Sequence, residues 1–284
     1  MRLSVVIPAK NEATVIGNLV CRIAALSSVD EIVVVDDGSA DGTAQQAAAA
    51  GARVISHPYS QGNGAAIKSG ARTAKGEIIV FMDGDGQHNP DDIPRLLARL
   101  DEGYDMVVGA RQKGSQASVW RGLANRFYNR LASYMTGHKV EDLTSGFRAA
   151  RADKFREFLS LLPNGFSYPT TCTMAFFRSG YAVAYEPIDA ARRIGKSHIQ
   201  LVRDGLRFLL IIFKIGTLYS PLKLFTPIAG SFLGVGLLYY AYTYLEYGRF
   251  TNMSALLLTT AVIVFLIGLV SEQIAQLMYA KADK

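Results

Sequence analysis

Two aspartates separated by a single glycine are the residues whose type and spacing are best suited to chemistry. Asp83 and Asp85 directly follow the apolar run Ile78–Met82, which is typical of a buried strand. Hard divalent cations prefer oxygen ligands, and Mg²⁺ is usually held by one or two carboxylates together with substrate phosphates. The spacing therefore predicts that Asp83 and Asp85 hold a divalent cation against a phosphorylated ligand. An acidic turn is the simpler alternative.

Polar clusters also follow other apolar runs of the chain. The runs are continuously apolar and alternate with helical patterns, which predicts an α/β fold with a mostly parallel sheet covered by helices on both faces. Ligands bind at the carboxyl ends of such strands, so we expect the clusters to form one site with Asp83 and Asp85. The clusters are Pro8–Glu12 after Leu3–Ile7, Asp36–Ser39 after Glu31–Val35, and Gly109–Arg111 after Asp105–Val108.

Asp36 and Asp37 stand side by side at the end of the second run. We expect one carboxylate to accept hydrogen bonds from a nucleobase and the other to cap the following turn. We assign the base to Asp37. The alternative is that both aspartates only cap the turn and the helix that begins near Asp41.

The apolar residues of the chain are concentrated near its end. The sequence has 284 residues, 50% of them apolar, and few charged residues follow Leu218. The stretches Leu222–Leu245 and Met253–Met278 are long enough to span a membrane. Glu272 is expected to lie near the membrane interface or to pair within the protein. Before them, Ile199–Tyr219 predicts an amphipathic helix at the membrane surface, with a core-packed linker helix as the alternative.

Charge and the start of the chain indicate where the protein acts. The net charge is +6, but aromatic residues are not interleaved with a basic stripe, so we expect a membrane lipid rather than nucleic acid as partner. The first residues lack the features of a signal peptide, so we place the α/β domain in the cytoplasm and the spans in the inner cell membrane. The expected boundaries are 1–198 for that domain, 199–220 for the juxtamembrane segment, and 221–284 for a two-helix hairpin.

Several motifs in order carry a resemblance to a known family. Ser4–Glu12, Ile32–Thr43 and Asp83–His88 resemble the inverting family 2 glycosyltransferases with a GT-A fold. Asp142–Arg148 and Arg192–Ser197 are similar to the branch that contains dolichol-phosphate mannose synthases and bacterial polyprenyl-phosphate glycosyltransferases. The chain departs from that branch in having glycines on both sides of the second aspartate, where alanine and leucine are common.

The resemblance implies a role for individual residues. It implies that the nucleotide is lined by Pro8, Ala9, Glu12, Asp37 and Asp83, and that Mg²⁺ or Mn²⁺ is held by Asp83, Asp85 and Gln87. It implies that Arg111 and Arg126 meet the acceptor phosphate with Ser145 nearby, these three forming the catalytic set with Asp85. It also implies a loop that closes over the donor and carries Arg193, Lys196 and Ser197.

These expectations combine into a predicted reaction. It is the inverting, metal-dependent transfer of one sugar, mannose or glucose by resemblance, from a UDP- or GDP-sugar to a polyprenyl phosphate. A phosphate acceptor is already ionised at pH 7, so no general base is required.

Two alternatives remain at this point. One is a membrane glycosyltransferase with a hydroxyl acceptor on a glycolipid or polysaccharide. It would need a base, for which Asp142 is the fallback, although capping is the other interpretation of this residue. The other alternative is a non-catalytic membrane protein that binds a nucleotide sugar. Gly230, Gly234 and Gly236 would allow close helix packing and a homo-oligomer.

Overall fold

The computed structural model describes residues 2–112, 119–165, 167–189, 213 and 216–282. The chain divides into two compact units, Met1–His198 and Ile199–Lys284. The predicted donor loop with Arg193, Lys196 and Ser197 lies outside the described residues, as does most of the predicted amphipathic helix.

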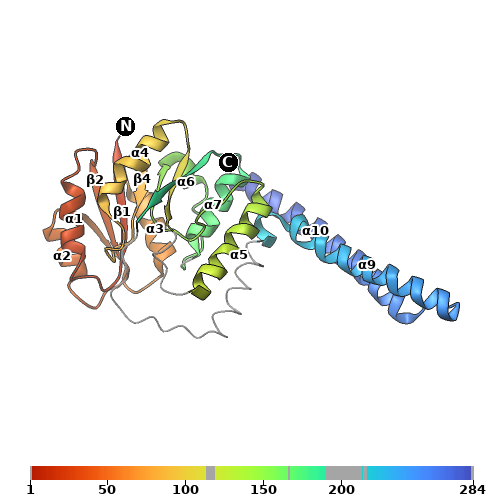
Figure 1. Cartoon of the computed structure of the whole chain (residues 1–284). Helices are drawn as coiled ribbons and strands as arrows, with labels where there is room; N and C mark the ends of the chain where they lie inside the picture. The colour runs from red at the N-terminus through yellow and green to blue at the C-terminus, as the bar shows by residue number, and fades with distance from the viewer. Residues whose placement is uncertain (1, 113–118, 166, 190–212, 214–215, 283–284) are drawn as a thin grey trace. The chain divides into compact units, whose positions relative to one another are not determined.

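The first unit is built on a seven-stranded sheet with the order β3-β2-β1-β4-β6-β5-β7 (Figure 1). Strand β6 is antiparallel to its neighbours β4 and β5, and the other neighbouring pairs are parallel. The strands are β1 (Leu3–Ala9), β2 (Glu31–Asp36), β3 (Arg53–Ser56), β4 (Ile78–Phe81), β5 (Met106–Arg111), β6 (Arg148–Arg151) and β7 (Val183–Ile188).

Helices cover both faces of this sheet. On one face, α1, α2 and α4 bury an apolar core with strand residues such as Val5, Val34 and Val80. On the other face lie α3, α6 and α7, and Phe155 of α6 packs on Phe81 with 4.4 Å between ring centroids. The helical segments of this unit are α1 (Ile16–Ala24), α2 (Thr43–Ala49), α3 (Asn63–Thr73), η1 (Pro90–Asp92), α4 (Ile93–Asp101), α5 (Val119–Thr136), α6 (Ala152–Glu157) and α7 (Tyr168–Arg178).

The predicted fold class is confirmed, and the four apolar runs named from the sequence correspond to β1, β2, β4 and β5. Strands β6 and β7 were not predicted, because arginine stands at both ends of β6 and a Glu-Pro pair interrupts β7. The first helix begins at Ile16, several residues after the polar cluster Pro8–Glu12. Asn11 has a φ of 55°, in the left-handed region, so the chain cannot start a right-handed helix there.

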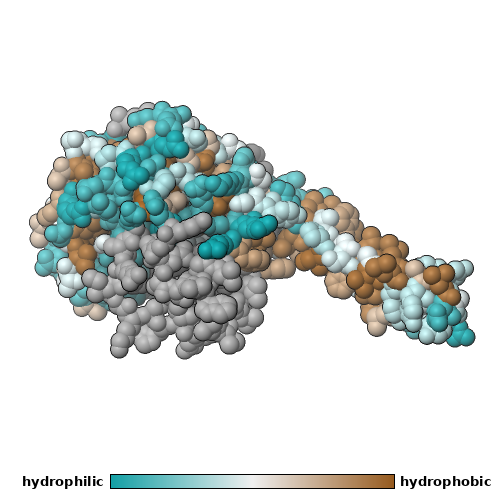
Figure 2. All heavy atoms as spheres, viewed as in Figure 1, coloured by the Kyte–Doolittle hydropathy of each residue, from teal (hydrophilic) through white to brown (hydrophobic). Residues whose placement is uncertain are grey.

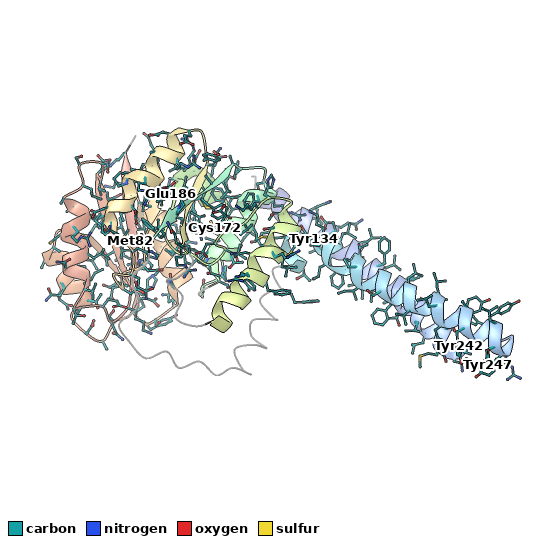
Figure 3. All side chains as sticks on the ribbon, viewed as in Figure 1. Met82, Tyr134, Cys172, Glu186, Tyr242 and Tyr247 are labelled. Carbon is teal, nitrogen blue, oxygen red and sulfur yellow. The ribbon has the colours of Figure 1, made fainter. Side chains whose placement is uncertain are left out.

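The second unit contains two antiparallel apolar helices, α9 (Pro221–Tyr247) and α10 (Asn252–Ala282). Both are long and apolar enough to cross a membrane, and only 11% and 17% of their most apolar windows are buried. They therefore differ from the core helices of a soluble protein. Figure 2 shows the apolar surface along them, and Figure 3 places Tyr242 and Tyr247 near the turn of the hairpin.

Small residues and one acidic side chain join the two helices. A Cβ on Gly236 would lie 3.1 Å from Leu257 and Leu258 of α10, so this glycine lets the helices approach each other. Glu272 Oε2 accepts a hydrogen bond of 3.4 Å from the backbone N–H of Leu222, in the first turn of α9. Self-association of the hairpin through the other glycines stays a prediction.

Gly70 provides a test of how closely α3 packs on the sheet. A Cβ at Gly70 would lie 2.3 Å from Val6 Cγ1 and 3.2 Å from Val35 Cγ2. Gly70→Ala should lower the free energy of unfolding by about 1–3 kcal/mol through overpacking. Gly17→Ala in α1 is the matched control, because its Cβ would find its nearest neighbour at 3.7 Å. Equal thermal unfolding midpoints for the two full-length variants in the same detergent would contradict this packing.

Candidate functional site

A cleft of about 360 Å³ opens beyond the carboxyl ends of β1, β2 and β4. This is the edge at which ligands bind in open α/β sheets. Its walls are formed by Pro8, Ala9, Lys10, Glu12, Asp37, Ser60, Gly62, Asn63, Ala66, Asp83, Gly84 and Asp85. All five residues predicted to line a nucleotide are therefore brought together. Lys10 belongs to the predicted cluster Pro8–Glu12, whereas Ser60 and Asn63 were given no role from the sequence.

The loops that follow β1 and β2 are tied to each other. Asn11 adopts its left-handed conformation at this junction, and both its backbone N–H and its side chain form hydrogen bonds to the loop after β2. The two loops thus form one wall of the cleft, because polar residues of the first motif are hydrogen-bonded to polar residues of the second. Four hydrogen bonds cross between them: Asn11 N to Ser39 Oγ (2.9 Å), Ala40 N to Asn11 Oδ1 (2.9 Å), Glu12 N to Thr43 Oγ1 (2.9 Å) and Ala13 N to Asp41 Oδ2 (3.2 Å).

The two aspartates after β2 have different tasks. Asp36 caps the turn, because its carboxylate accepts hydrogen bonds from the backbone N–H and hydroxyl of Ser39. The carboxylate of Asp37 accepts four hydrogen bonds from the segment 57–62, two on each oxygen. The donors are His57 Nδ1 (2.8 Å) and Gln61 N (2.8 Å) to Oδ1, and Ser60 Oγ (2.8 Å) and Gly62 N (2.9 Å) to Oδ2.

These hydrogen bonds control the charge of Asp37. Burial alone would raise its pKa, but the bonds from His57 and the loop outweigh burial and lower the pKa to about 2. Nε2 of His57 lies 2.9 Å from Ser69 Oγ, so this histidine links Asp37 to α3. The predicted hydrogen bond between Asp37 and a nucleobase stays a prediction. In this structure both carboxylate oxygens already accept hydrogen bonds from protein groups.

Asp83 and Asp85 stand on the side of the cleft formed by β4. Asp83 Oδ1 is 3.4 Å from Asn63 Nδ2, and Asp83 Oδ2 is 3.9 Å from His88 Nε2. A Cβ on Gly146 would lie 2.6 Å from Asp83 Oδ2, so a larger residue at position 146 would displace this carboxylate. Burial raises the pKa of Asp83; His88 opposes that shift, and the negative charge of Asp85 adds to it.

The donor set fits a hard divalent cation. Asp83 and Asp85 both line the cleft, and the buried Oδ1 of Asn63 has no hydrogen-bond partner among the described residues. No cluster of three or more His, Cys, Asp or Glu side chains suited to a metal occurs within these residues, so substrate oxygens would have to complete the shell. The backbone N–H of Gln87 donates to Asp85 Oδ1 at 3.1 Å, and metal binding by its side chain stays a prediction.

Arg111, at the end of β5, forms a bidentate ion pair with Asp142. Its Nε donates to Asp142 Oδ2 at 2.7 Å and its Nη2 to Oδ1 at 2.9 Å. Nη2 also donates to Thr144 Oγ1 at 2.5 Å. Burial alone would raise the pKa of Asp142, but the bonds from Arg111 lower it. Asp142 is thus an ionised partner that orients Arg111, rather than the free base considered as a fallback.

Arg126, predicted to meet the acceptor phosphate, and Ser145, predicted to lie near it, are not among the residues that line the cleft. Arg126 is exposed on α5. Ser145 is buried, and its Oγ has no hydrogen-bond partner in the part of the chain that the structure describes. Among the described residues, neither of these side chains nor Arg111 lines the cleft. Their contact with an acceptor stays a prediction.

Arg148 is a buried cation that the sequence did not single out for chemistry. Its side chain is fully buried, and it donates to the backbone oxygens of Ser145 and, at 3.0 Å, Pro169. Tyr168 Oη donates to the backbone oxygen of Gly146 at 3.3 Å. Together, Arg148 and Tyr168 hold the backbone that lies against Asp83.

The mostly parallel sheet with a carboxylate pair in the cleft at its carboxyl edge is consistent with the class of GT-A glycosyltransferase domains. Comparisons with known proteins place the chain within that class. Residues 4–159 match the family Glycosyl transferase family 2, and residues 220–277 match the GtrB C-terminal hairpin. The chain belongs to glycosyl transferase family 2.

The curated relatives share one name. The chain is 37% identical over 160 residues to the undecaprenyl-phosphate 4-deoxy-4-formamido-L-arabinose transferase of Klebsiella pneumoniae subsp. pneumoniae. The match covers 53% of this chain and 49% of that relative, so the aligned region spans about half the length of each protein. The protein of the same name from Salmonella choleraesuis is 36% identical over the same length, with the same coverage.

Solved structures of similar fold include a glycosyl transfer enzyme with its ligands. Glucosyl-3-phosphoglycerate synthase from Mycobacterium tuberculosis, in complex with Mn²⁺, UDP and phosphoglyceric acid, matches with a TM-score of 0.61 and 27% identity. The match covers 76% of this chain and 78% of that one. The same enzyme in complex with Mg²⁺ and UDP matches with the same TM-score.

Asp37 gives the folded protein a pH-dependent contribution to stability. Its folded pKa of about 2 is below the ordinary value of 3.8 for an aspartate, so the contribution is present above about pH 4 and is lost as the pH falls towards 2. Asp37→Asn should lower the free energy of unfolding by about 2 kcal/mol at pH 7, with a smaller difference at pH 3. Denaturant unfolding of both full-length proteins measures the difference. Asp101→Asn, at the exposed end of α4, is the control and should change stability little at either pH. If the loss of unfolding free energy in Asp37→Asn were as large at pH 3 as at pH 7, the low pKa assigned to Asp37 would be refuted.

Proposed function

We propose that this protein transfers a sugar from a nucleoside diphosphate sugar to a polyprenyl phosphate, with inversion at the anomeric carbon and with Mg²⁺ or Mn²⁺ as cofactor. The observation that carries the proposal is the combination of matches in one chain. A family 2 domain with an aspartate pair in its cleft precedes a hairpin of the GtrB type. The undecaprenyl phosphate in the names of the relatives supports the acceptor class.

The aspartate pair would bind the donor through the metal. Asp83 and Asp85 supply carboxylate oxygens on the β4 side of the cleft, and Asn63 Oδ1 is free to add a third oxygen. When bound, the divalent cation would neutralise the charge that develops on the departing diphosphate. The Mn²⁺ and Mg²⁺ complexes of the M. tuberculosis synthase support this choice of metal. Gly146 leaves the space in which the Asp83 carboxylate stands.

Arg111 is the cation best placed by the protein to act on an acceptor phosphate. The ion pair with Asp142 fixes the plane of its guanidinium, so little side-chain freedom is lost when a phosphate binds. Arg126 and Ser145 would complete the acceptor site, and the donor loop with Arg193, Lys196 and Ser197 would close over the sugar. An ionised phosphate attacks without losing a proton, which agrees with the engagement of Asp142 by Arg111.

The identity of the transferred sugar rests on different observations from those that support the acceptor. The names of the curated relatives specify 4-deoxy-4-formamido-L-arabinose, so they do not support the predicted mannose or glucose. The proposal is therefore limited to a nucleotide-linked sugar, with the arabinose-type donor first in the panel to be tested. The proposed site of action is the inner membrane, with the catalytic domain in the cytoplasm and the hairpin in the bilayer.

The proposed reaction is tested directly with the full-length protein in detergent micelles. Purified protein is incubated with Mg²⁺ or Mn²⁺, undecaprenyl phosphate and a panel of UDP- and GDP-sugars that includes the arabinose type. A lipid-linked sugar detected by mass spectrometry is the expected product. Donor binding without a lipid-linked product from any donor would favour a non-catalytic nucleotide-sugar-binding protein.

Asp85 should be required for turnover. Asp85→Ala removes one of the carboxylates offered to the metal and should lower the rate of lipid-linked sugar formation by at least about 100-fold. Asp101→Asn is the control for loss of an acidic side chain outside the cleft and should retain the rate of the unchanged protein. Undiminished activity of Asp85→Ala would refute the metal assignment.

Asp142 distinguishes a phosphate acceptor from a hydroxyl acceptor. Asp142→Asn breaks the ion pair with Arg111, and we expect the KM for polyprenyl phosphate to rise by about tenfold or more while the donor KM is unchanged. A loss confined to kcat, with both KM values intact, would instead indicate that Asp142 acts as a base for a hydroxyl acceptor. Steady-state kinetics with each substrate varied in turn separates the two results.

A further inference from the structure

His88 is a buried histidine next to the aspartate pair, and the proposed function gives it no task. The residue is only 7% exposed, and its ring nitrogen Nδ1 is buried without a hydrogen-bond partner in the part of the chain that the structure describes. The other ring nitrogen, Nε2, lies 3.9 Å from Asp83 Oδ2. Buried polar atoms are nearly always hydrogen-bonded, so a histidine kept here with one unpaired nitrogen calls for a physical reason.

The backbone on both sides of His88 is held in place. Gly86, two residues before it, has a φ of 71°, in the left-handed region that glycine adopts without strain, and this conformation turns the chain after the aspartate pair. Asn89, directly after it, accepts a hydrogen bond of 2.6 Å on its Oδ1 from Arg22 of α1. The position of His88 beside Asp83 is therefore set by the loop and does not depend on a ligand.

The plane of the His88 ring is set by a stacked phenylalanine. The ring centroids of His88 and Phe147 are 5.2 Å apart, and the ring planes are inclined by 23°. Phe147 is fully buried in the core of the sheet, and its neighbour Gly146 packs against Asp83 Oδ2. The stack thus keeps Nε2 on the side of Asp83, and the ring cannot turn away without disturbing the core.

The surroundings of the ring indicate which nitrogen carries the proton. Burial lowers the pKa of His88, which favours a neutral ring with one N–H donor and one acceptor nitrogen. A proton on Nε2 faces the carboxylate of Asp83 and leaves Nδ1 as an unpaired acceptor. A proton on Nδ1 would bury an unpaired N–H and set the lone pair of Nε2 against a carboxylate, which is the costlier arrangement. We therefore assign the proton to Nε2.

We propose that His88 is a positioning residue for the divalent cation, and that it orients the carboxylate of Asp83 by donating Nε2–H to Oδ2. The distance of 3.9 Å exceeds a hydrogen bond by about 1 Å, and the side chain of Asp83, which is 31% exposed, can close it by rotating. Hydrogen-bond partners of metal ligands typically change metal affinity by about 10–100-fold. The inference rests on the proposed function, since it assumes that the aspartate pair binds a divalent cation.

Two amide substitutions separate the ring nitrogens of His88. His88→Gln places an N–H donor near the position of Nε2, whereas His88→Asn places it near the position of Nδ1, and His88→Phe keeps a ring without either nitrogen. The control is His138→Phe, because His138 also stacks on a phenylalanine, Phe177, at 5.1 Å, but is exposed and lies outside the cleft. The dissociation constant of Mn²⁺ is measured by electron paramagnetic resonance on the full-length proteins in detergent, with UDP or GDP present. Thermal unfolding in the same detergent reports whether each variant is folded.

His88→Asn and His88→Phe should each weaken Mn²⁺ binding by about tenfold or more, whereas His88→Gln stays within about threefold of the unchanged protein and His138→Phe has no effect. Should His88→Phe fail to fold, the comparison of the two amide variants decides alone. Equal affinities of His88→Gln and His88→Asn, whether both are retained or both are lost, would overturn the inference, because the position of the donor would then not matter. If the unchanged protein bound no Mn²⁺ with either nucleotide, the metal site of the proposed function would itself fail.

Discussion

Asp37 stands where the sheet ends, and its carboxylate accepts four hydrogen bonds from the segment 57–62. The rest of the cleft depends on this interaction. Gly62, one of the donors, precedes α3, and the next residue, Asn63, lies against Asp83. One buried charge directly after β2 thus positions the N-terminus of α3 and, through it, the side chain beside the aspartate pair that follows β4. A low pKa keeps that charge present across the physiological range.

Two arginines, Arg111 and Arg148, fix the conformation of the motif 142–148, which precedes and enters β6. Arg111 forms a two-pronged ion pair with Asp142 at the start of the motif 142–148, and Arg148 at its end binds the backbone oxygen of Ser145. Each guanidinium donates to the motif itself, Arg111 to the Asp142 carboxylate and Arg148 to the Ser145 backbone, and these bonds hold the intervening residues in place. Gly146 is thereby held against Asp83. The segment contributes to the site through backbone position as well as through charge.

The sequence predicted the elements whose patterns are local. Continuous apolar runs identified β1, β2, β4 and β5, and the polar clusters after them identified most of the cleft, including the aspartate pair. Strand β6 escaped prediction because it buries Arg148, whose Nη1 donates to Pro169 and Thr173 of α7, more than 20 residues further along the chain. The engagement of Asp37 and Asp142 was also not predictable in detail, because their partners come from segments about 20 and 31 residues away. Residue types indicated which groups gather at the sheet edge, whereas tertiary contacts decide which of them remain free for a ligand.

The central claim is that the cleft beyond β1, β2 and β4 binds a nucleoside diphosphate through a divalent cation on Asp83 and Asp85. Electron paramagnetic resonance of Mn²⁺ tests it most directly, because the signal of free Mn²⁺ falls when the ion is bound. In a titration of the full-length protein, UDP or GDP should strengthen Mn²⁺ binding, and this effect should be absent from a variant that carries both Asp83→Asn and Asp85→Asn. Nucleotide-dependent Mn²⁺ binding that persisted in the double variant would contradict the account.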